Sequence, residues 1–300
     1  MQAALEPDHR GGFAGGRASA GEGGGNLMLR VASAVVLAPA VLLCAYLGGW
    51  AFLALCAVAA GVVLWEWASL VARRGDPRIL AAGWAAILAA ALLIGFDRPP
   101  NVALGAIVLG AVAAAISTAT WAGPSARRFA PAWDAGGVAY AAMILFGPAL
   151  LRRDPEWGLT ALLFLFATVW MTDIFAFFCG RALGGPPLWR SVSPNKTWSG
   201  AIGGLLGGVA AGVAVAYASG IGRLGIIGVM ALACSVLAQA GDLFESAVKR
   251  RFGAKDASHL IPGHGGVMDR LDGFIFAALF AALFGAFRGL SSVAAGLFLW

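Results

Sequence analysis

Charged side chains are scarce in this sequence. Only 12% of its 300 residues are Asp, Glu, Lys or Arg, whereas 60% are hydrophobic, and the mean hydropathy is +0.82. A soluble domain carries roughly a quarter charged residues, so one water-soluble core cannot hold this much apolar surface. The composition therefore predicts a polytopic membrane protein. The net charge of +6 does not indicate nucleic-acid binding, because the basic residues gather in loops between apolar runs.

Cysteine is also sparse, and its spacing argues against metal or disulfide chemistry. The cysteines are Cys44, Cys56, Cys179 and Cys234. Each lies within an apolar run, and no two of them form a C-x-x-C pair. We interpret them as small buried hydrophobic residues.

The beginning of the chain differs from everything after it. Residues 1–29 are rich in glycine, alanine and charge, which predicts a disordered tail. The apolar run starts only near Val31 and is followed by many more, a poor fit to a cleaved signal peptide. We expect the first span to act as an uncleaved insertion signal.

The apolar runs predict an all-α fold with about nine transmembrane spans, because a bilayer core about 30 Å thick needs about 20 apolar residues per helix. The expected spans are residues 31–48, 50–70, 79–96, 102–121, 136–151, 158–180, 199–220, 224–245 and 273–299. The fifth is short, and the last is interrupted at Arg288 and Gly289.

The distribution of Lys and Arg favours a cytoplasmic N-terminus. Most basic residues then fall on the cytoplasmic side, and the bias keeps its sign, although weaker, without the loops 181–198 and 246–272. Both of these charged loops would face the cytoplasm, where nucleoside triphosphates are found.

Two groups of carboxylates lie near the two ends of the loop 246–272. Asp242 and Glu245 precede it and, with Ser246, share one helix face by their spacing, at a helix end where acids are disfavoured. Asp269 and Asp272 open the last span, where helix capping could explain one acid but not both. A divalent cation would compensate such a concentration of carboxylates.

Groups suited to phosphate lie between these acids. The basic residues are Lys249, Arg250, Arg251, Lys255 and Arg270. Attraction to anionic lipid is an alternative reading of the run, and it does not exclude phosphate binding. Gly265 and Gly266 can present backbone N–H groups to phosphate. His264 could bond phosphate, bind metal or only satisfy the loop.

Further candidates lie upstream. The segment Ser193–Trp198 reads as a turn, and Lys196 and Thr197 could bind phosphate near a helix start. Asp173 lies inside an expected span, where a carboxylate is a functional candidate by default.

Two features of the spans carry alternative readings. Glu66 lies between Trp65 and Trp67 and is either interfacial or an intramembrane carboxylate with a partner. The glycines at positions 200–212 form a small-residue face, which favours close helix packing.

The residues Ser246–Asp272 resemble the signature of the phosphatidate cytidylyltransferases, S-x-x-K-R-x4-K-D-x5-P-G-H-G-G-x-x-D-R-x-D. D-x-x-A-F-x-x-G-R from Asp173, S-P-N-K-T from Ser193 and G-D-L from Gly241 are similar to the family as well. One departure is Ser199, where the family often has Glu.

The resemblance implies transfer of a cytidylyl group from CTP to phosphatidate, with one or two Mg²⁺ ions. The implied catalytic residues are Asp242, Ser246, Lys249, Arg250, Asp269 and Asp272, with Asp242 and Asp269 as metal ligands. The implied substrate-binding residues are Asp173, Ser193, Lys196, Thr197, Lys255, His264, Gly265, Gly266 and Arg270.

The resemblance also implies a homodimer in the cell inner membrane with its active site in the cytoplasm. Residues 30–155 would form an N-terminal transmembrane region and residues 156–300 the catalytic region.

Rival classes fit less well. A CDP-alcohol phosphotransferase carries D-G-x-x-A-R, and the chain begins this pattern at Asp272 but does not continue it. A CTP-dependent enzyme acting on a prenol lipid stays open. A transporter would place its charges near the bilayer midplane, whereas most here lie at one interface.

Overall fold

The computed structural model describes residues 20–72, 77–121, 130–261 and 265–300, and these are almost wholly helical. The elements are α1 (Ala20–Leu47), α2 (Gly49–Ala72), α3 (Pro77–Gly95), α4 (Pro100–Trp121), α5 (Ala130–Arg152), α6 (Gly158–Leu183), β1 (Pro187–Trp189), β2 (Ser193–Thr197), α7 (Trp198–Ala218), α8 (Leu224–Arg251), α9 (Met268–Phe287) and α10 (Val293–Phe298). In the described residues, 8 helices (α2 to α9) are long and apolar enough to cross a membrane, and the apolar part of α1 is shorter. The predicted polytopic helical fold is confirmed.

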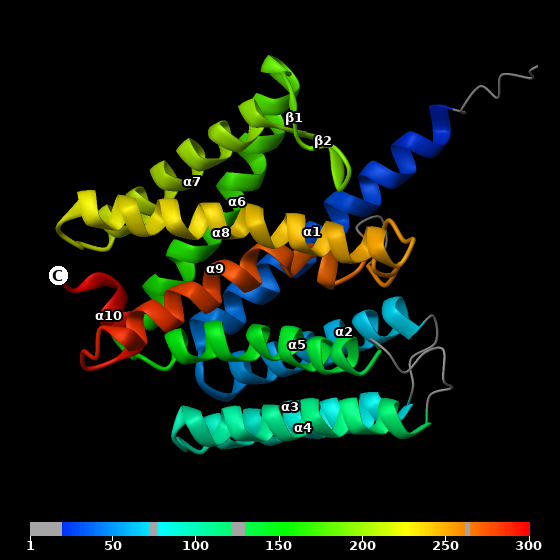
Figure 1. Cartoon of the computed structure of the whole chain (residues 1–300). Coiled ribbons are helices and arrows are strands. Elements are labelled where there is room, and N and C mark those ends of the chain that lie inside the picture. Colours follow the sequence, from blue (N-terminus) through cyan, green and yellow to red (C-terminus); the bar gives the residue numbers. More distant parts are fainter. Residues whose placement is uncertain (1–19, 73–76, 122–129, 262–264) are drawn as a thin grey trace, which may run out of the picture.

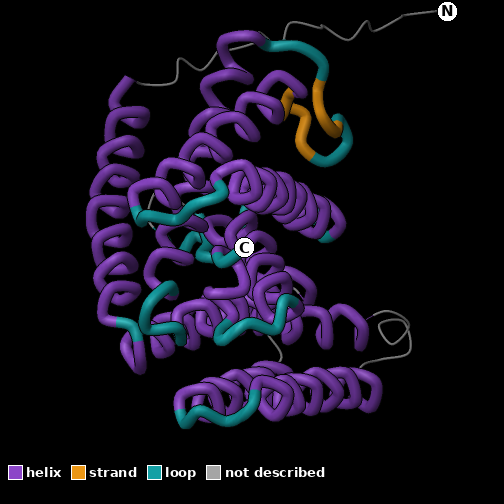
Figure 2. Tube along the Cα trace, turned by 90° about the vertical axis from the view of Figure 1, so that its left-hand side faces the viewer, coloured by secondary structure: helices purple, strands orange, loops and turns teal. Residues whose placement is uncertain are grey.

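The helices are stacked in layers (Figure 1). The pair α3 and α4 lies at the bottom of the view, α2 and α5 lie above it, and α8 and α9 cross the middle of the molecule. The pair α6 and α7 leans away at the top, with the β1–β2 hairpin beyond it (Figures 1 and 2). The end of α8 and the start of α9 lie at the same side as the end of α2.

The close contact between α6 and α7 depends on glycines of α7, which have no side chain. A Cβ on Gly204 would lie 2.8 Å from the backbone oxygen of Thr172, and one on Gly208 would lie 2.9 Å from that of Thr168. The small-residue face therefore packs against α6, as the sequence predicts. The hydroxyls of Thr172 and Ser235, 2.6 Å apart, then join α6 to α8.

One arginine fastens α1 to the core. The Arg152 guanidinium, at the end of α5, donates to the backbone oxygens of Ala45 at 2.6 Å and Tyr46 at 2.9 Å. These carbonyls belong to the last turn of α1, which has no internal donors for them. The chain then turns into α2 through Gly48 and Gly49, both at positive φ, where glycine carries little strain.

Two helices in the N-terminal half start well before their predicted positions. The last residues of the predicted tail, from Ala20 onward, belong to α1, although the four glycines between Gly21 and Gly25 disfavour a helix, so local propensity does not account for this start. Residues 1–19 lie outside the described residues. The fifth helix begins at Ala130, six residues before the predicted start. Its Asp134 interrupts the apolar run, but this acid is buried and accepts a hydrogen bond from Thr118 at 2.6 Å.

Three differences fall in the C-terminal half. The eighth helix continues to Arg251 rather than ending at residue 245, because basic residues in its last turn suit the helix dipole. The segment predicted as a turn at Ser193 is strand β2, paired antiparallel with β1. The predicted last span is two helices, α9 and α10, separated at the predicted interruption, where Gly289 has φ of +62°.

The α6–α7 packing can be tested with a matched glycine pair. We expect Gly204→Ala to destabilise the protein by about 1–3 kcal/mol, because the added methyl overpacks against the α6 backbone. Gly225→Ala is the control, since a Cβ there meets nothing within 4 Å. Thermal unfolding in detergent measures both, and equal midpoints would contradict this packing.

Candidate functional site

Three carboxylates from two helices converge. Asp242 and Glu245 on α8 and Asp272 on α9 each offer an oxygen within 4.8 Å of the other two. The two helices approach closely because Gly241 on α8 and Gly273 on α9 face the partner helix and have no side chain. A Cβ on Gly241 would lie 2.5 Å from the backbone oxygen of Asp272. Such a group of oxygen ligands suits a hard divalent cation.

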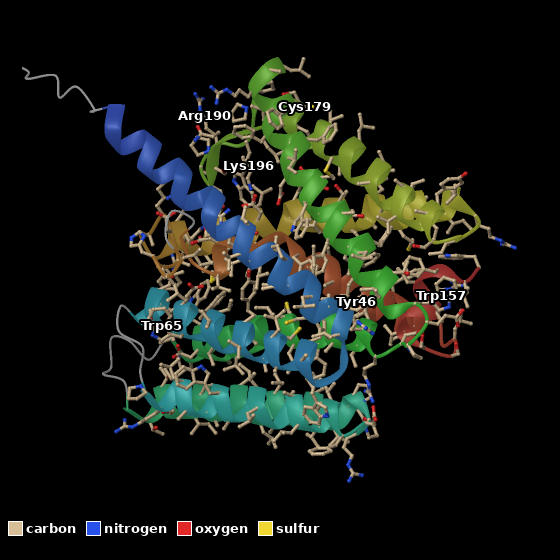
Figure 3. The ribbon with its side chains drawn as sticks, turned by 180° about the vertical axis from the view of Figure 1, so that it is seen from behind. Tyr46, Trp65, Trp157, Cys179, Arg190 and Lys196 are labelled. Atoms are coloured by element: carbon tan, nitrogen blue, oxygen red, sulfur yellow. The ribbon has the colours of Figure 1, made fainter. Side chains whose placement is uncertain are left out.

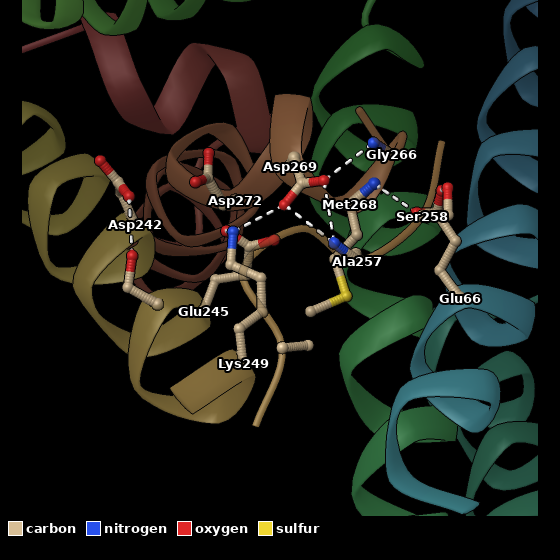
Figure 4. Close-up of polar contacts among 12 residues, drawn as sticks. Glu66, Asp242, Glu245, Lys249, Ala257, Ser258, Gly266, Met268, Asp269 and Asp272 are labelled. Carbon is tan, nitrogen blue, oxygen red and sulfur yellow. Dashed lines mark hydrogen bonds and ion pairs between the residues drawn. The ribbon is translucent and has the colours of Figure 1, made fainter. Parts of the chain in front are cut away.

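A buried lysine organises the acids (Figure 4). The Lys249 ammonium donates to Glu245 Oε2 at 2.9 Å and to Asp269 Oδ1 at 2.6 Å. The side chains of Lys249, Glu245 and Asp269 are 12%, 1% and 7% exposed, so water screens these ion pairs little. Glu245 Oε1 is buried and has no hydrogen-bond partner among the described residues. That oxygen is free to accept from a ligand.

Asp269 has a different role from the three clustered acids. Besides Lys249, it accepts hydrogen bonds from the backbone N–H groups of Ala257 at 3.1 Å and Gly266 at 2.8 Å. Among the described residues, Asp269 is not a member of the clustered group. The proposed metal pair of Asp242 and Asp269 stays a prediction, and the geometry favours Glu245 and Asp272 as the companions of Asp242.

The hairpin brings a second lysine to the cluster. Lys196, on β2, forms an ion pair with Asp242, and the Ser246 hydroxyl lies 3.5 Å from the same carboxylate. Figure 3 shows Lys196 and Arg190 beside the end of α6 that carries Cys179. The exposed Asp173, also on α6, is near enough for the charges of Asp242, Lys196 and Arg270 to act on it.

Other predicted site residues are held by the backbone. The Arg250 guanidinium donates to the backbone oxygens of Val192 at 3.4 Å and Ala254 at 3.1 Å, which ties the end of α8 to the hairpin. Thr197 caps α7 by accepting the N–H of Gly200 at 3.1 Å. The structure therefore gives these two residues structural contacts in addition to any contact with substrate.

The remaining candidates border the cluster. Lys255 and Arg270 are exposed, and Ser193 is partly buried at the start of β2. Gly265 has φ of +89° and Gly266 is buried beside Asp269. His264 lies outside the described residues.

An aromatic group lies beside the acids. Trp67, Tyr140, Phe244 and Phe276 come from α2, α5, α8 and α9. Ring centroids are 5.1 Å apart for Trp67 and Tyr140, 5.9 Å for Tyr140 and Phe244, and 5.5 Å for Phe244 and Phe276. Because Phe244 and Phe276 adjoin the acidic positions on their helices, this packing holds α8 and α9 against the N-terminal half.

Two acids of the site lie outside the residues that the resemblance implies. The spacing places Glu245 on one helix face with Asp242, and the structure brings both into the cluster. Glu66 is fully buried on α2 and accepts hydrogen bonds from the segment that leads into α9. The structure shows that Glu66 has the partners that its second sequence reading requires, whereas its depth in the membrane stays a prediction.

The site is thus a set of buried and partly buried carboxylates, with Lys249, at the ends of two membrane-spanning helices, and the hairpin adds Lys196. The model of the cytidylyltransferase family matches residues 28–287, which include the whole site. The chain belongs to the cytidylyltransferase family.

Curated members of this family include close relatives. The chain is 42% identical to the phosphatidate cytidylyltransferase of Brucella abortus over 275 residues, which cover 91% of this chain and 98% of the relative. It is 39% identical to the Haemophilus influenzae enzyme of the same name over 158 residues, or 49% of this chain and 55% of that one. It is 42% identical to the Staphylococcus aureus enzyme over 120 residues, or 40% and 46%.

The importance of Lys249 to the folded site can be measured by stability. We expect Lys249→Ala to cost about 3–5 kcal/mol, because it leaves Glu245 and Asp269 buried without their shared cation. Arg251→Ala is the control, since Arg251 is exposed in the same helical turn. Denaturation in detergent micelles compares the two. Equal stabilities would show that Lys249 is not part of a buried network.

Proposed function

We propose that this protein transfers the cytidylyl group of CTP to phosphatidate, giving CDP-diacylglycerol and pyrophosphate. One observation carries the proposal. Acids and lysines converge where α8 ends and α9 begins, in and beside the signature segment, and the chain is similar to a phosphatidate cytidylyltransferase over nearly its whole length. A site of this composition neutralises phosphate and binds cations, as the reaction requires.

The chemistry needs no nucleophilic side chain. An oxygen of the lipid phosphate bonds to the α-phosphorus of CTP, and the bond to the oxygen bridging the α- and β-phosphates breaks to release pyrophosphate. The phosphate oxygen is already nucleophilic, so catalysis consists of positioning the reactants and stabilising charge.

The lysines supply part of that stabilisation. Lys249 uses two of its ammonium donors on Glu245 and Asp269, and an ammonium has three. The third can reach a phosphate oxygen while the ion pairs hold the group in place. Lys196 pairs with Asp242 and can exchange that contact for the triphosphate.

Mg²⁺ fits the chain's own residues. Asp242, Glu245 and Asp272 would hold it. The feature that indicates this is the buried Oε1 of Glu245, which has no hydrogen-bond partner in the part of the chain that the structure describes. Mg²⁺ commonly binds one or two carboxylates together with substrate phosphates. When bound, it would polarise phosphate oxygens and stabilise the charge on pyrophosphate.

We further propose that the protein acts as a homodimer in the cell inner membrane. Its N-terminus and active site would be cytoplasmic, as the distribution of Lys and Arg favours. CTP would enter from the cytoplasm and the lipid laterally from the bilayer.

The reaction is tested with purified protein, phosphatidate vesicles and CTP labelled separately at the α- or γ-phosphate. We expect α-label in the extracted lipid and γ-label in pyrophosphate, with a requirement for divalent cation. Absence of both transfers with every cation would refute the proposal. Transfer to a prenol phosphate but not to phosphatidate would move the assignment to the prenol-lipid alternative.

The ligand set is tested by direct binding of Mn²⁺, followed by electron paramagnetic resonance. Removing a ligand charge beside a dication costs several kcal/mol, so Glu245→Gln should weaken binding by about 100-fold or more. Asp269→Asn should weaken it by about tenfold, as loss of a supporting contact does. The reverse order would favour Asp242 and Asp269 as the metal pair.

A further inference from the structure

Glu66 joins the N-terminal half of the chain to the first turn of α9. Its Oε1 accepts hydrogen bonds from the Ser258 hydroxyl at 2.5 Å and from the backbone N–H of Val267 at 2.9 Å. Its Oε2 accepts the N–H of Met268 at 2.6 Å. Figure 4 shows this carboxylate reaching from α2 toward the segment that leads into α9. These helix partners are 201 and 202 residues away in the sequence.

Glu66 accepts hydrogen bonds from backbone N–H groups at the start of α9 that would otherwise have no partner. The first N–H groups of any helix have no partner within the helix, and the Val267 side chain makes no capping hydrogen bond. A carboxylate at this place also meets the positive end of the helix dipole. Glu66 therefore acts as the cap of α9 from another helix, which accounts for a fully buried acid in a membrane-spanning segment.

Gly266 lies between Glu66 and Asp269 and so connects the cap of α9 to the acidic site. Its N–H donates to Asp269 Oδ2 at 2.8 Å. A Cβ on Gly266 would lie 2.7 Å from Glu66 Oε1 and 3.1 Å from Asp269 Oδ2. Glycine is needed for both carboxylates to reach the same short stretch of backbone.

We propose that Glu66 is a positioning residue for the cation-binding acids. It holds the turn from which Asp269 meets Lys249 and from which Asp272 meets the acids of α8. A shift of that turn would move Asp272 away from Asp242 and Glu245. This inference rests on the proposed function of the acidic cluster, of which Glu66 itself is not a member among the described residues.

The test is Glu66→Gln in the full-length protein in lipid nanodiscs. The amide keeps the size and one acceptor oxygen, but it presents an N–H₂ group where Oε2 accepted the N–H of Met268. We expect Mn²⁺ affinity, measured by electron paramagnetic resonance, to fall by about 10- to 100-fold, the usual effect of losing a group that supports metal ligands. The Mg²⁺ concentration for half-maximal transfer should rise in parallel.

Two controls separate positioning from general loss of structure. Asp134→Asn removes another buried carboxylate, on α5, that is bound to Thr118, and it should leave Mn²⁺ affinity unchanged. Ser258→Ala removes a donor to Glu66 but leaves both α9 N–H contacts, so its effect should be smaller than that of Glu66→Gln. Wild-type Mn²⁺ affinity in Glu66→Gln would overturn the proposal, and so would an equal loss in either control.

If Glu66→Gln does not fold, Glu66→Asp is the second variant. It keeps the charge but shortens the side chain by one methylene, so its oxygens no longer reach both the Val267 and the Met268 N–H groups. Mn²⁺ affinity should again fall, and an unchanged affinity would contradict the proposal. Failure of the proposed function would show differently, as wild-type protein that binds Mn²⁺ but transfers no cytidylyl group, or that binds no Mn²⁺ at all.

Discussion

The placement of Lys249 between Glu245 and Asp269 is the interaction on which the site depends. One ammonium joins an acid on α8 to an acid on α9, with all three side chains nearly excluded from water. Buried charges are tolerated only when they are paired and hydrogen-bonded. The pairing therefore determines how the ends of α8 and α9 face each other.

Other contacts hold the ends of α8 and α9 in this arrangement. Gly241 and Gly273 let the two helices approach until backbone meets backbone. The rings of Trp67 and Tyr140 pack the pair against α2 and α5. Because the segment before α9 is also held by Glu66, the N-terminal helices do more than anchor the protein in the membrane. They set the geometry of acids that lie far away in the sequence.

The fold could be predicted from the sequence because hydropathy alone locates membrane helices. Two of the wrong boundaries lie where a polar residue continues a helix, as Asp134 does in α5 and as the basic end of α8 does. A third is the start of α1, which helix propensity does not account for because the segment is rich in glycine. The acids of the site were recognisable from their spacing, but their partners were not. Spacing places Asp242 and Asp269 at adjoining helix ends, yet only the packed structure shows that Asp269 is engaged with Lys249 and that Glu245 joins the cluster instead. Glu66 could be flagged as an acid within a span, but a contact across 201 residues has no local signal.

In the mechanism that we propose, the lipid phosphate attacks CTP directly, in a site that positions both reactants and supplies charge but no nucleophile. The stereochemical course at the α-phosphorus tests it most directly, with CTP made chiral there by sulfur and the product's configuration read by phosphorus NMR. A single displacement predicts inversion. Retention would contradict the account, because it requires two displacements and a side chain, such as Ser246, that carries the cytidylyl group in between.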